Sequence, residues 1–189
     1  MNVLMRRRAY TNPVAIPTLV LVDLQREYVA SPRALAIASI NAALENCTAA
    51  LACAREIGLP VAHVRLNGLS AFFNAATPYS DWIEGFTPLG SEMVFERTRP
   101  SCYSSDRFAQ VMGDAGSTFV LAGFAGESAC IATMIDAFHR NHAVTYLYDA
   151  SGSHALEGFD SEASHRMVGK LCDLYGATMT TSAWIDSVS

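Results

Sequence analysis

Residues 118–150 read TFVLAGFAGESACIATMIDAFHRNHAVTYLYDA, and this stretch decides the expected fold. It begins with a short apolar run, Thr118 to Ala122, which is typical of a buried strand and is closed by Gly123. We predict a helix over residues 127–141 and a second strand over residues 143–148. A strand, a helix and a strand in this order predict a βαβ unit, in which the strands are parallel and the crossover is right-handed.

The same alternation runs through the rest of the chain. Further strands are expected over residues 18–23, 60–64, 93–96 and 177–181, and further helices over residues 32–57, 105–112 and 161–174. These elements imply an α/β fold of three layers, a mostly parallel six-stranded sheet with helices on both faces. The alternative within this class is a flavodoxin-like or Rossmann-type nucleotide domain. No GxGxxG follows the first strand and no Walker A sequence occurs, so we expect no cofactor.

The composition is that of a globular protein without a nucleic-acid or membrane partner. The 189 residues suit a single domain over residues 1–189, with residues 1–16 as an N-terminal extension. The chain is 51% hydrophobic and 16% charged, so it can bury a sizeable core, and its net charge of -5 argues against nucleic acid. No apolar run approaches the ~20 residues that span a bilayer, and we see no signal peptide, so we expect a cytoplasmic protein.

The cysteines and histidines do not indicate a metal site. The five cysteines form no CxxC pair, and an odd number in a cytoplasmic chain is typical of free thiols. The five histidines are not at ligand spacing with nearby acidic residues, so we expect no metal.

Polar side chains follow two of the predicted strands, where ligands bind in open parallel sheets. Asp23 ends the first strand, and burial there can raise its pKa and make it a proton donor or acceptor. Alternatively, Asp23 caps a turn or pairs with an arginine. Arg97 follows the third strand, where a fixed cation can hold a carboxylate or a developing oxyanion. A surface salt bridge is the other interpretation of Arg97.

The segment from residue 123 to 130 joins the fourth strand to its helix. Its small residues let backbone N–H groups point at a ligand, and the start of a helix favours negative charge. Cys130 in this first turn would have a lowered pKa and be nucleophilic. Alternatively, Cys130 is a small core residue that packs on the sheet.

Four motifs in chain order resemble those of the isochorismatase-like hydrolases, a superfamily of nicotinamidases, carbamoyl-group amidohydrolases and isochorismatases. They are Leu21-Val22-Asp23-Leu24-Gln25, Arg97-Thr98-Arg99-Pro100-Ser101-Cys102-Tyr103, Leu121-Ala122-Gly123-Phe124-Ala125 followed by Thr133 and Asp136-Ala137, and Asp149-Ala150. The resemblance covers nearly the whole chain and implies a parallel sheet of about six strands with helices on both faces. The cysteine hydrolases of this family use an Asp-Lys-Cys triad, and backbone amides near the cysteine stabilise the oxyanion.

This chain departs from that triad at two positions. By the resemblance, Asp23 is the matched aspartate, Arg97 stands in the place of the lysine, and Ala129 stands in the place of the cysteine. Alanine cannot form a thioester, and arginine keeps its proton at neutral pH. Amidase activity therefore does not transfer directly.

Three functions stay open. In one, Cys130 is the nucleophile one residue out of register, although such a shift turns a helical side chain by about 100°. In the one that we favour, the chain is a hydrolase that acts through Asp23 acid–base chemistry without a thiol. It would then resemble isochorismatases, which carry glycine at the nucleophile position and cysteine directly after it, and Arg97 would clamp a substrate carboxylate or polarise its oxygen. In the third, the chain is a non-catalytic ligand-binding or assembly module.

The remaining expectations concern the substrate and the assembly. We expect a small-molecule substrate to contact Gln25, Tyr28, Tyr103, Phe124, Ala125 and Ala129. Residues 67–91 form a long irregular segment with five aromatic residues, which is either a lid or a subunit interface. We favour the interface, because members of the family commonly form dimers or larger assemblies, and we expect a homodimer or larger homo-oligomer.

Overall fold

A computed structural model describes residues 16–38, 40–68 and 70–188 of the chain. The expected N-terminal extension, residues 1–16, lies outside the described residues except for Ile16. Within the described part of the chain, no helix is both long enough and apolar enough to cross a membrane.

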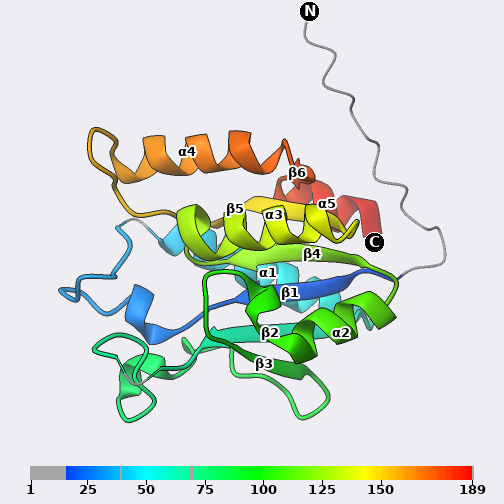
Figure 1. Cartoon of the computed structure of the whole chain (residues 1–189), viewed down its shortest axis with the longest axis horizontal. Coiled ribbons are helices and arrows are strands. Elements are labelled where there is room, and N and C mark those ends of the chain that lie inside the picture. The colour runs from blue at the N-terminus through cyan, green and yellow to red at the C-terminus, as the bar shows by residue number, and fades with distance from the viewer. Residues whose placement is uncertain (1–15, 39, 69, 189) are drawn as a thin grey trace, which may run out of the picture.

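The described chain forms one six-stranded sheet in which every neighbouring pair of strands is parallel (Figure 1). The strand order is β3-β2-β1-β4-β5-β6, so the order reverses between the two central strands. The strands are β1 (Thr18–Val22), β2 (Val61–Leu66), β3 (Met93–Arg97), β4 (Thr118–Gly123), β5 (Ala143–Ser151) and β6 (Ala177–Met179). The predicted α/β architecture with a parallel six-stranded sheet is confirmed.

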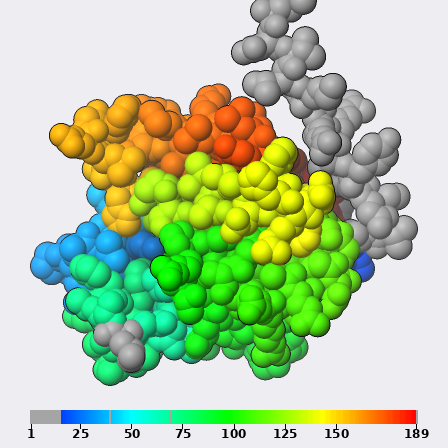
Figure 2. All heavy atoms as spheres, viewed as in Figure 1, coloured from blue at the N-terminus to red at the C-terminus, as the bar shows by residue number. Residues whose placement is uncertain are grey.

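Helices cover both faces of this sheet. On one face, α1 (Asn41–Glu56) and α5 (Thr181–Val188) pack against Leu19 and Leu21 of β1. On the other face lie α2 (Asp106–Asp114), α3 (Ile131–His139) and α4 (Ser161–Cys172). Side chains of α2 and α3 cover this second face in the space-filling view (Figure 2). All five residues of β1 are buried, because β1 lies at the centre of a sheet that is covered on both sides.

Short helices occupy several of the connections near the ends of the strands. Three are 3₁₀-helices and one is a π-helix: η1 (Arg26–Tyr28), η2 (Pro78–Ser80), η3 (Cys102–Ser104) and the π-helix η4 (Gly126–Cys130). The helix predicted over residues 127–141 is therefore divided into η4 and α3, which ends at His139.

Two predictions about the elements were wrong. The helix predicted from residue 32 begins only at Asn41, because the chain before it folds back, and the backbone N–H of Ile37 donates to the carbonyl oxygen of Tyr28 at 2.9 Å. The last strand, predicted to reach residue 181, ends at Met179, and α5 follows it. The N–H and the hydroxyl of Thr181 each donate to Asp149 Oδ1 at 2.8 Å, and these bonds hold the start of α5.

The aromatic side chains of residues 67–91 are largely used within the chain. Phe73 and Phe86 are buried in the core, and the ring of Tyr79 lies 4.0 Å from the guanidinium carbon of Arg33. Phe72 is 37% exposed. The fold of this segment is thus stabilised by most of its aromatic residues, and few of them are free to contact a partner.

Candidate active site

The candidate site lies where the sheet order reverses, beyond the carboxyl ends of β1 and β4. Val22 and Gly123 are partners in the register of these two strands, so the residues that follow them emerge side by side. Such a reversal point is where open α/β sheets bind ligands. Asp23 is the first residue after β1, is fully buried, and has a positive φ of 49°.

Gly123 is required for the close approach of the two strands at this point. Its φ is +115°, and a Cβ atom built on it would lie 2.1 Å from the carbonyl oxygen of Val22. No larger residue fits there without moving the backbone that carries Asp23.

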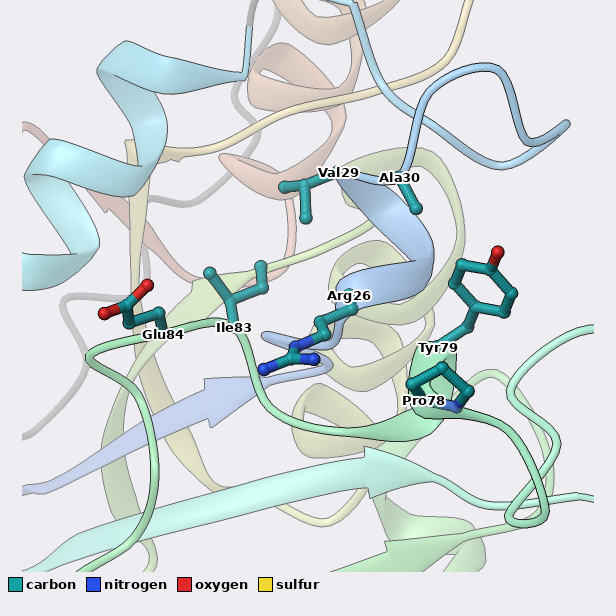
Figure 3. A pocket seen from close by; sticks show the side chains of 7 residues that line it. All are labelled: Arg26, Val29, Ala30, Pro78, Tyr79, Ile83 and Glu84. Carbon is teal, nitrogen blue, oxygen red and sulfur yellow. The ribbon is translucent and has the colours of Figure 1, made fainter.

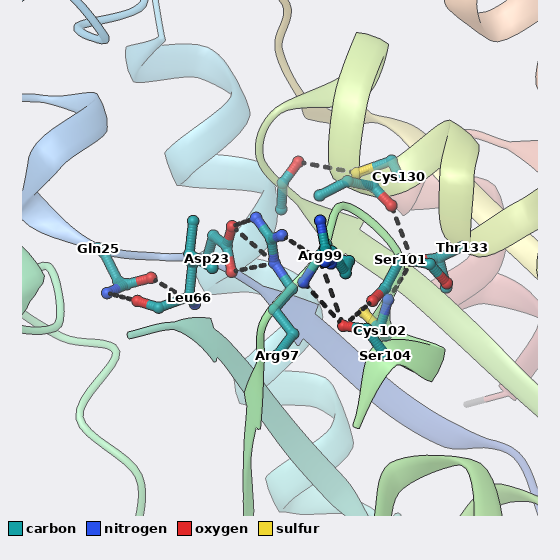
Figure 4. Close-up of polar contacts among 12 residues, drawn as sticks. Asp23, Gln25, Leu66, Arg97, Arg99, Ser101, Cys102, Ser104, Cys130 and Thr133 are labelled. Atoms are coloured by element: carbon teal, nitrogen blue, oxygen red, sulfur yellow. Dashed lines mark hydrogen bonds and ion pairs between the residues drawn. The ribbon is translucent and has the colours of Figure 1, made fainter. Parts of the chain in front are cut away.

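Arg97 reaches Asp23 from the end of β3, across the end of β2 (Figure 4). Its Nε donates to both carboxylate oxygens of Asp23, at 3.0 and 3.1 Å, and its Nη2 donates to Oδ2. Its Nη1 donates to the carbonyl oxygen of Arg99 at 2.6 Å. Only 4% of the Arg97 side chain is exposed, so this is a buried ion pair with hydrogen bonds from a planar fork.

Burial decides the direction of the Asp23 pKa. Desolvation raises the pKa of Asp23 above its ordinary value, and the charge and hydrogen bonds of Arg97 oppose that rise. Desolvation acts against the charge of Arg97 too, but Asp23 more than offsets it and raises the pKa of Arg97. Asp23 can therefore hold a proton more readily than an exposed aspartate can, beside a cation that stays charged.

Gln25 holds the neighbouring connections in place. Its Nε2 donates to the carbonyl oxygens of Leu66 and Ser80 at 2.9 and 2.8 Å, and its Oε1 accepts from the Leu66 N–H at 3.0 Å. The side chain is fully buried. Gln25 was expected to contact the substrate, and the structure places its amide in bonds to the backbone at the end of β2 and in η2.

Cys130 faces the core rather than Asp23. Its Sγ lies 3.5 Å from the carbonyl oxygen of Gly123 and 3.8 Å from the hydroxyl of Ser151, and the side chain is fully buried. Burial raises the pKa of the Cys130 thiol well above its ordinary value. Among the described residues, no hydrogen bond joins Cys130 to Asp23 or Arg97 (Figure 4). This placement favours the interpretation of Cys130 as a small core residue.

The other expected contact residues are divided between two places. Tyr28 and Phe124 lie together, with ring centroids 6.0 Å apart, and Ala125 and Ala129 are buried in the connection after β4. Tyr103 is different, because its hydroxyl lies 2.7 Å from Nδ1 of His142, the residue before β5 begins. The structure therefore directs the Tyr103 hydroxyl to the opposite edge of the sheet.

Two polar residues that sequence reasoning did not single out lie near the site. Glu127, in η4, has its Oε1 2.6 Å from Nδ1 of His154, which lies between β5 and α4. The position of Glu127, in the first turn after a strand, could have indicated a site residue from the sequence alone. The position of His154 could not, because 27 residues separate it from Glu127 in the sequence.

A shallow hollow of about 380 Å³ lies over η1 and the chain that follows η2 (Figure 3). Its lining residues are Arg26, Val29, Ala30, Pro78, Tyr79, Ile83 and Glu84, which do not include Asp23 or Arg97. Within the described ranges, no group of three or more His, Cys, Asp or Glu side chains is arranged to hold a metal ion.

The parallel sheet with helices on both faces is the fold expected of an isochorismatase-like hydrolase, and comparison with known proteins agrees with it. The model of the isochorismatase domain matches residues 17–183, so the chain belongs to the isochorismatase family. No protein of curated function matches the chain.

Solved structures share the fold. An isochorismatase from Pseudomonas putida KT2440 is 24% identical, with a TM-score of 0.82, over 89% of this chain and 90% of its own. A putative isochorismatase hydrolase from Oleispira antarctica is 21% identical, with a TM-score of 0.83, over 92% and 97%. A cysteine hydrolase from Pseudomonas syringae pv. phaseolicola 1448A is 18% identical, with a TM-score of 0.81, over 92% and 93%. At these identities the likeness concerns the fold alone.

Proposed function

We propose that the chain hydrolyses a small molecule by acid–base chemistry at Asp23, without a thiol nucleophile. The observation that carries this proposal is the buried Asp23–Arg97 pair at the reversal point of the sheet. Ala129 stands at the position of the family nucleophile, and the neighbouring Cys130 thiol points at the core. A carboxyl group with a raised pKa holds a proton more readily than an exposed one and is suited to act as a proton donor.

The proposed chemistry begins with an exchange of partners on Arg97. A substrate carboxylate takes the place of Asp23 on the guanidinium fork, and Asp23 in its neutral form is then free to donate its proton. With a vinyl ether, the proton adds to the terminal vinyl carbon, and water adds to the oxocarbenium carbon that this forms. The hemiketal then collapses to an alcohol and a ketone, and the proton from water returns to Asp23.

A second candidate is a ligand-binding module without catalysis. It is favoured by the pairing itself, because both oxygens of Asp23 already accept hydrogen bonds from Arg97. A third, a cysteine amidohydrolase that uses Cys130, has less support, because the thiol is buried and its pKa is raised.

A hydrolysis panel of primary amides, carbamoyl compounds and isochorismate-like vinyl ethers separates these functions. The wild type is compared with Asp23→Asn and Cys130→Ser, under conditions where circular dichroism shows each variant to be folded. Cys47→Ser is the matched control for Cys130→Ser, because Cys47 is equally buried but lies on the other face of the sheet.

The proposal expects turnover of a vinyl ether that is lost in Asp23→Asn and retained in both cysteine variants. Loss in both Asp23→Asn and Cys130→Ser, with Cys47→Ser unaffected, would establish the thiol mechanism instead. Saturable binding of panel compounds without turnover by the wild type would favour the binding module.

We also propose that the protein is cytoplasmic and assembles as a homodimer or larger homo-oligomer. Support for assembly comes from exposed apolar side chains on α4 and in the turn that follows it, where Met167, Leu171 and Leu174 are 44%, 39% and 56% exposed. Exposed apolar patches of this kind mark protein contacts. Sedimentation of the wild type and of Leu171→Glu tests this, and a wild type that stays monomeric would contradict it.

A further inference from the structure

Glu127 is a second carboxylate beside the candidate site, and the proposed chemistry does not use it. It lies in η4, two residues before Ala129. Its Oε1 is 2.6 Å from Nδ1 of His154, and its Oε2 accepts from the backbone N–H of His154 at 3.3 Å. Both side chains are partly exposed, 15% for Glu127 and 23% for His154, so protons can exchange with solvent.

The two ring nitrogens of His154 both face acceptors. The second nitrogen, Nε2, lies 3.0 Å from the carbonyl oxygen of Leu35. A carbonyl oxygen only accepts hydrogen bonds, and so does an ionised carboxylate. Both bonds therefore exist together only when each nitrogen carries a proton, which makes His154 an imidazolium.

The charges of the pair agree with this geometry. Burial acts against ionisation of Glu127, but the hydrogen bond from His154 holds the pKa of Glu127 below its ordinary value. The same hydrogen bond raises the pKa of His154, more than desolvation lowers it. An ionised glutamate and a protonated histidine are thus each stabilised by the other.

Through Leu35, His154 fastens residues 29–38, the part of the chain that folds back after η1. The N–H of Ile37 donates to the carbonyl oxygen of Tyr28 at 2.9 Å, so this segment is also tied to the backbone of Tyr28. The ring of Tyr28 packs against His154, with centroids 5.9 Å apart. His154 therefore contacts both the segment and the side chain that the segment covers.

The hydroxyl of Tyr28 in turn responds to the charges of both carboxylates. Burial raises the pKa of its hydroxyl, and the negative charges of Asp23 and Glu127 act in the same direction, while Arg97 opposes them. All three charges lie close enough to act on one phenol group. A movement of Tyr28 would therefore change the surroundings of Asp23.

We propose that protonated His154 is a positioning residue, which fastens residues 29–38 to Glu127 and so holds Tyr28 in place in the connection that follows Asp23. Its link to catalysis rests on the proposed function. A neutral imidazole carries a single N–H, so loss of one proton breaks either the bond to Leu35 or the bond to Glu127. The titratable groups that face His154 are Glu127 from η4 and Tyr28 from η1, and residues 29–38 present the Leu35 carbonyl.

The protonation state can be measured without a substrate, by ¹⁵N NMR of the histidine rings in the full chain. The expected result is that both nitrogens of His154 carry protons at pH 6, and that the pKa of His154 lies above the ordinary value of 6.5. His139, which is exposed at the end of α3, serves as the control position in the exchange measurements. A neutral His154 at pH 6 would overturn the proposal.

Amide hydrogen exchange measures the fastening itself. At pH 6, we expect amides of residues 29–38 to exchange about tenfold faster in His154→Gln than in the wild type. The ratio of the two exchange rates should fall toward one as the pH rises, because the wild-type His154 then loses a proton and one of its two hydrogen bonds as well. His139→Gln should leave the exchange unchanged. If the amides of residues 29–38 exchange equally fast in His154→Gln and in the wild type at pH 6, the proposal is contradicted.

The link to catalysis is tested with whichever panel compound the wild type turns over. His154→Gln and Glu127→Gln should lower kcat/KM at pH 6 and remove the loss of activity that the wild type shows at higher pH. If the wild type turns nothing over, the proposed function fails, while NMR and exchange still decide the fastening. If the fastening fails but Asp23→Asn abolishes turnover, the proposed function stands without it.

Discussion

At the scale of single residues, Asp23 and Arg97 form a buried ion pair in which desolvation opposes the attraction between the charges. Both are removed from water, with 0% and 4% of their side chains exposed, and each offsets the desolvation of the other. A buried ion pair contributes little net stability compared with an apolar pair, but loss of one partner leaves an uncompensated charge. Each partner is thus needed in the folded state as long as the other is present.

Replacement of one partner should therefore cost more than replacement of both. We expect Asp23→Leu to lower the free energy of unfolding by about 3–5 kcal/mol, and the double variant with Arg97→Met to recover most of that loss. Urea denaturation measures both. Glu162→Gln is the control, because the Glu162–Arg166 pair is exposed and should contribute nothing measurable. A double variant less stable than Asp23→Leu would contradict this account.

Gly123 sets the geometry on the other side of the site. Gly123→Ala should lower the free energy of unfolding by about 3 kcal/mol or more, because a Cβ would meet the Val22 backbone and φ is positive. Gly113→Ala is the matched control, since no atom lies within 4 Å of its Cβ position and it is in α2. There alanine should raise stability by about 0.5–1 kcal/mol. Equal effects at both positions, measured by chemical denaturation, would refute the steric argument.

At the scale of elements, the helix α5 packs against the helix α1. Trp184 of α5 is 3% exposed and belongs to the same core cluster as α1, β1 and Phe124. The bonds from Thr181 to Asp149 tie the start of α5 to the strand β5. The last helix therefore belongs to the cooperative core.

Trp184→Ala should consequently cost about 3–5 kcal/mol, because it removes a large buried side chain between α5 and α1. The exposed Ser182→Ala in the same helix is the control and should shift the midpoint little. Thermal unfolding followed by far-ultraviolet circular dichroism measures both variants, since the second tryptophan, Trp82, complicates fluorescence. A small loss in Trp184→Ala would show that α5 frays independently.

For the molecule as a whole, two histidines should give stability opposite dependences on pH. Burial lowers the pKa of His63 from 6.5, despite the bond of His63 to Glu92. The contribution of His63 to the free energy of unfolding is therefore complete above about pH 6.5 and is lost as the pH falls. The pKa of His154 is raised from 6.5. The contribution of His154 to the free energy of unfolding is therefore complete below about pH 6.5 and is lost as the pH rises through the pKa of His154 in the folded state. The two effects partly cancel in the wild type.

Single variants should separate the effects of His63 and His154 on stability. Unfolding free energy is measured in urea between about pH 5 and pH 8. In His63→Gln, it should fall less on acidification than in the wild type. In His154→Gln, the loss relative to the wild type should be largest at the acid end and shrink as the pH rises. The same pH dependence in both variants would refute the assignment of opposite shifts.

The sequence by itself determined the layers of this protein and the edge of the sheet at which the candidate site lies. Apolar runs and helical spacing are local patterns, and they predicted every strand of the sheet and the positions of Asp23 and Arg97 at strand ends. Parallel strands place their carboxyl ends at one edge, so a candidate site could be proposed there without coordinates. The family motifs were equally readable, and the match to the isochorismatase domain confirms the family.

Only the tertiary structure decided which of these groups meet. The pairing of Asp23 with Arg97 spans 74 residues, and that of Glu127 with His154 spans 27, so no local pattern indicates them. The direction of the Cys130 thiol depends on the π-helical turn before α3, and a shift of one residue there rotates a side chain by about 100°. Local periodicity fixes elements, whereas side-chain partners follow from packing between segments that are distant in the sequence.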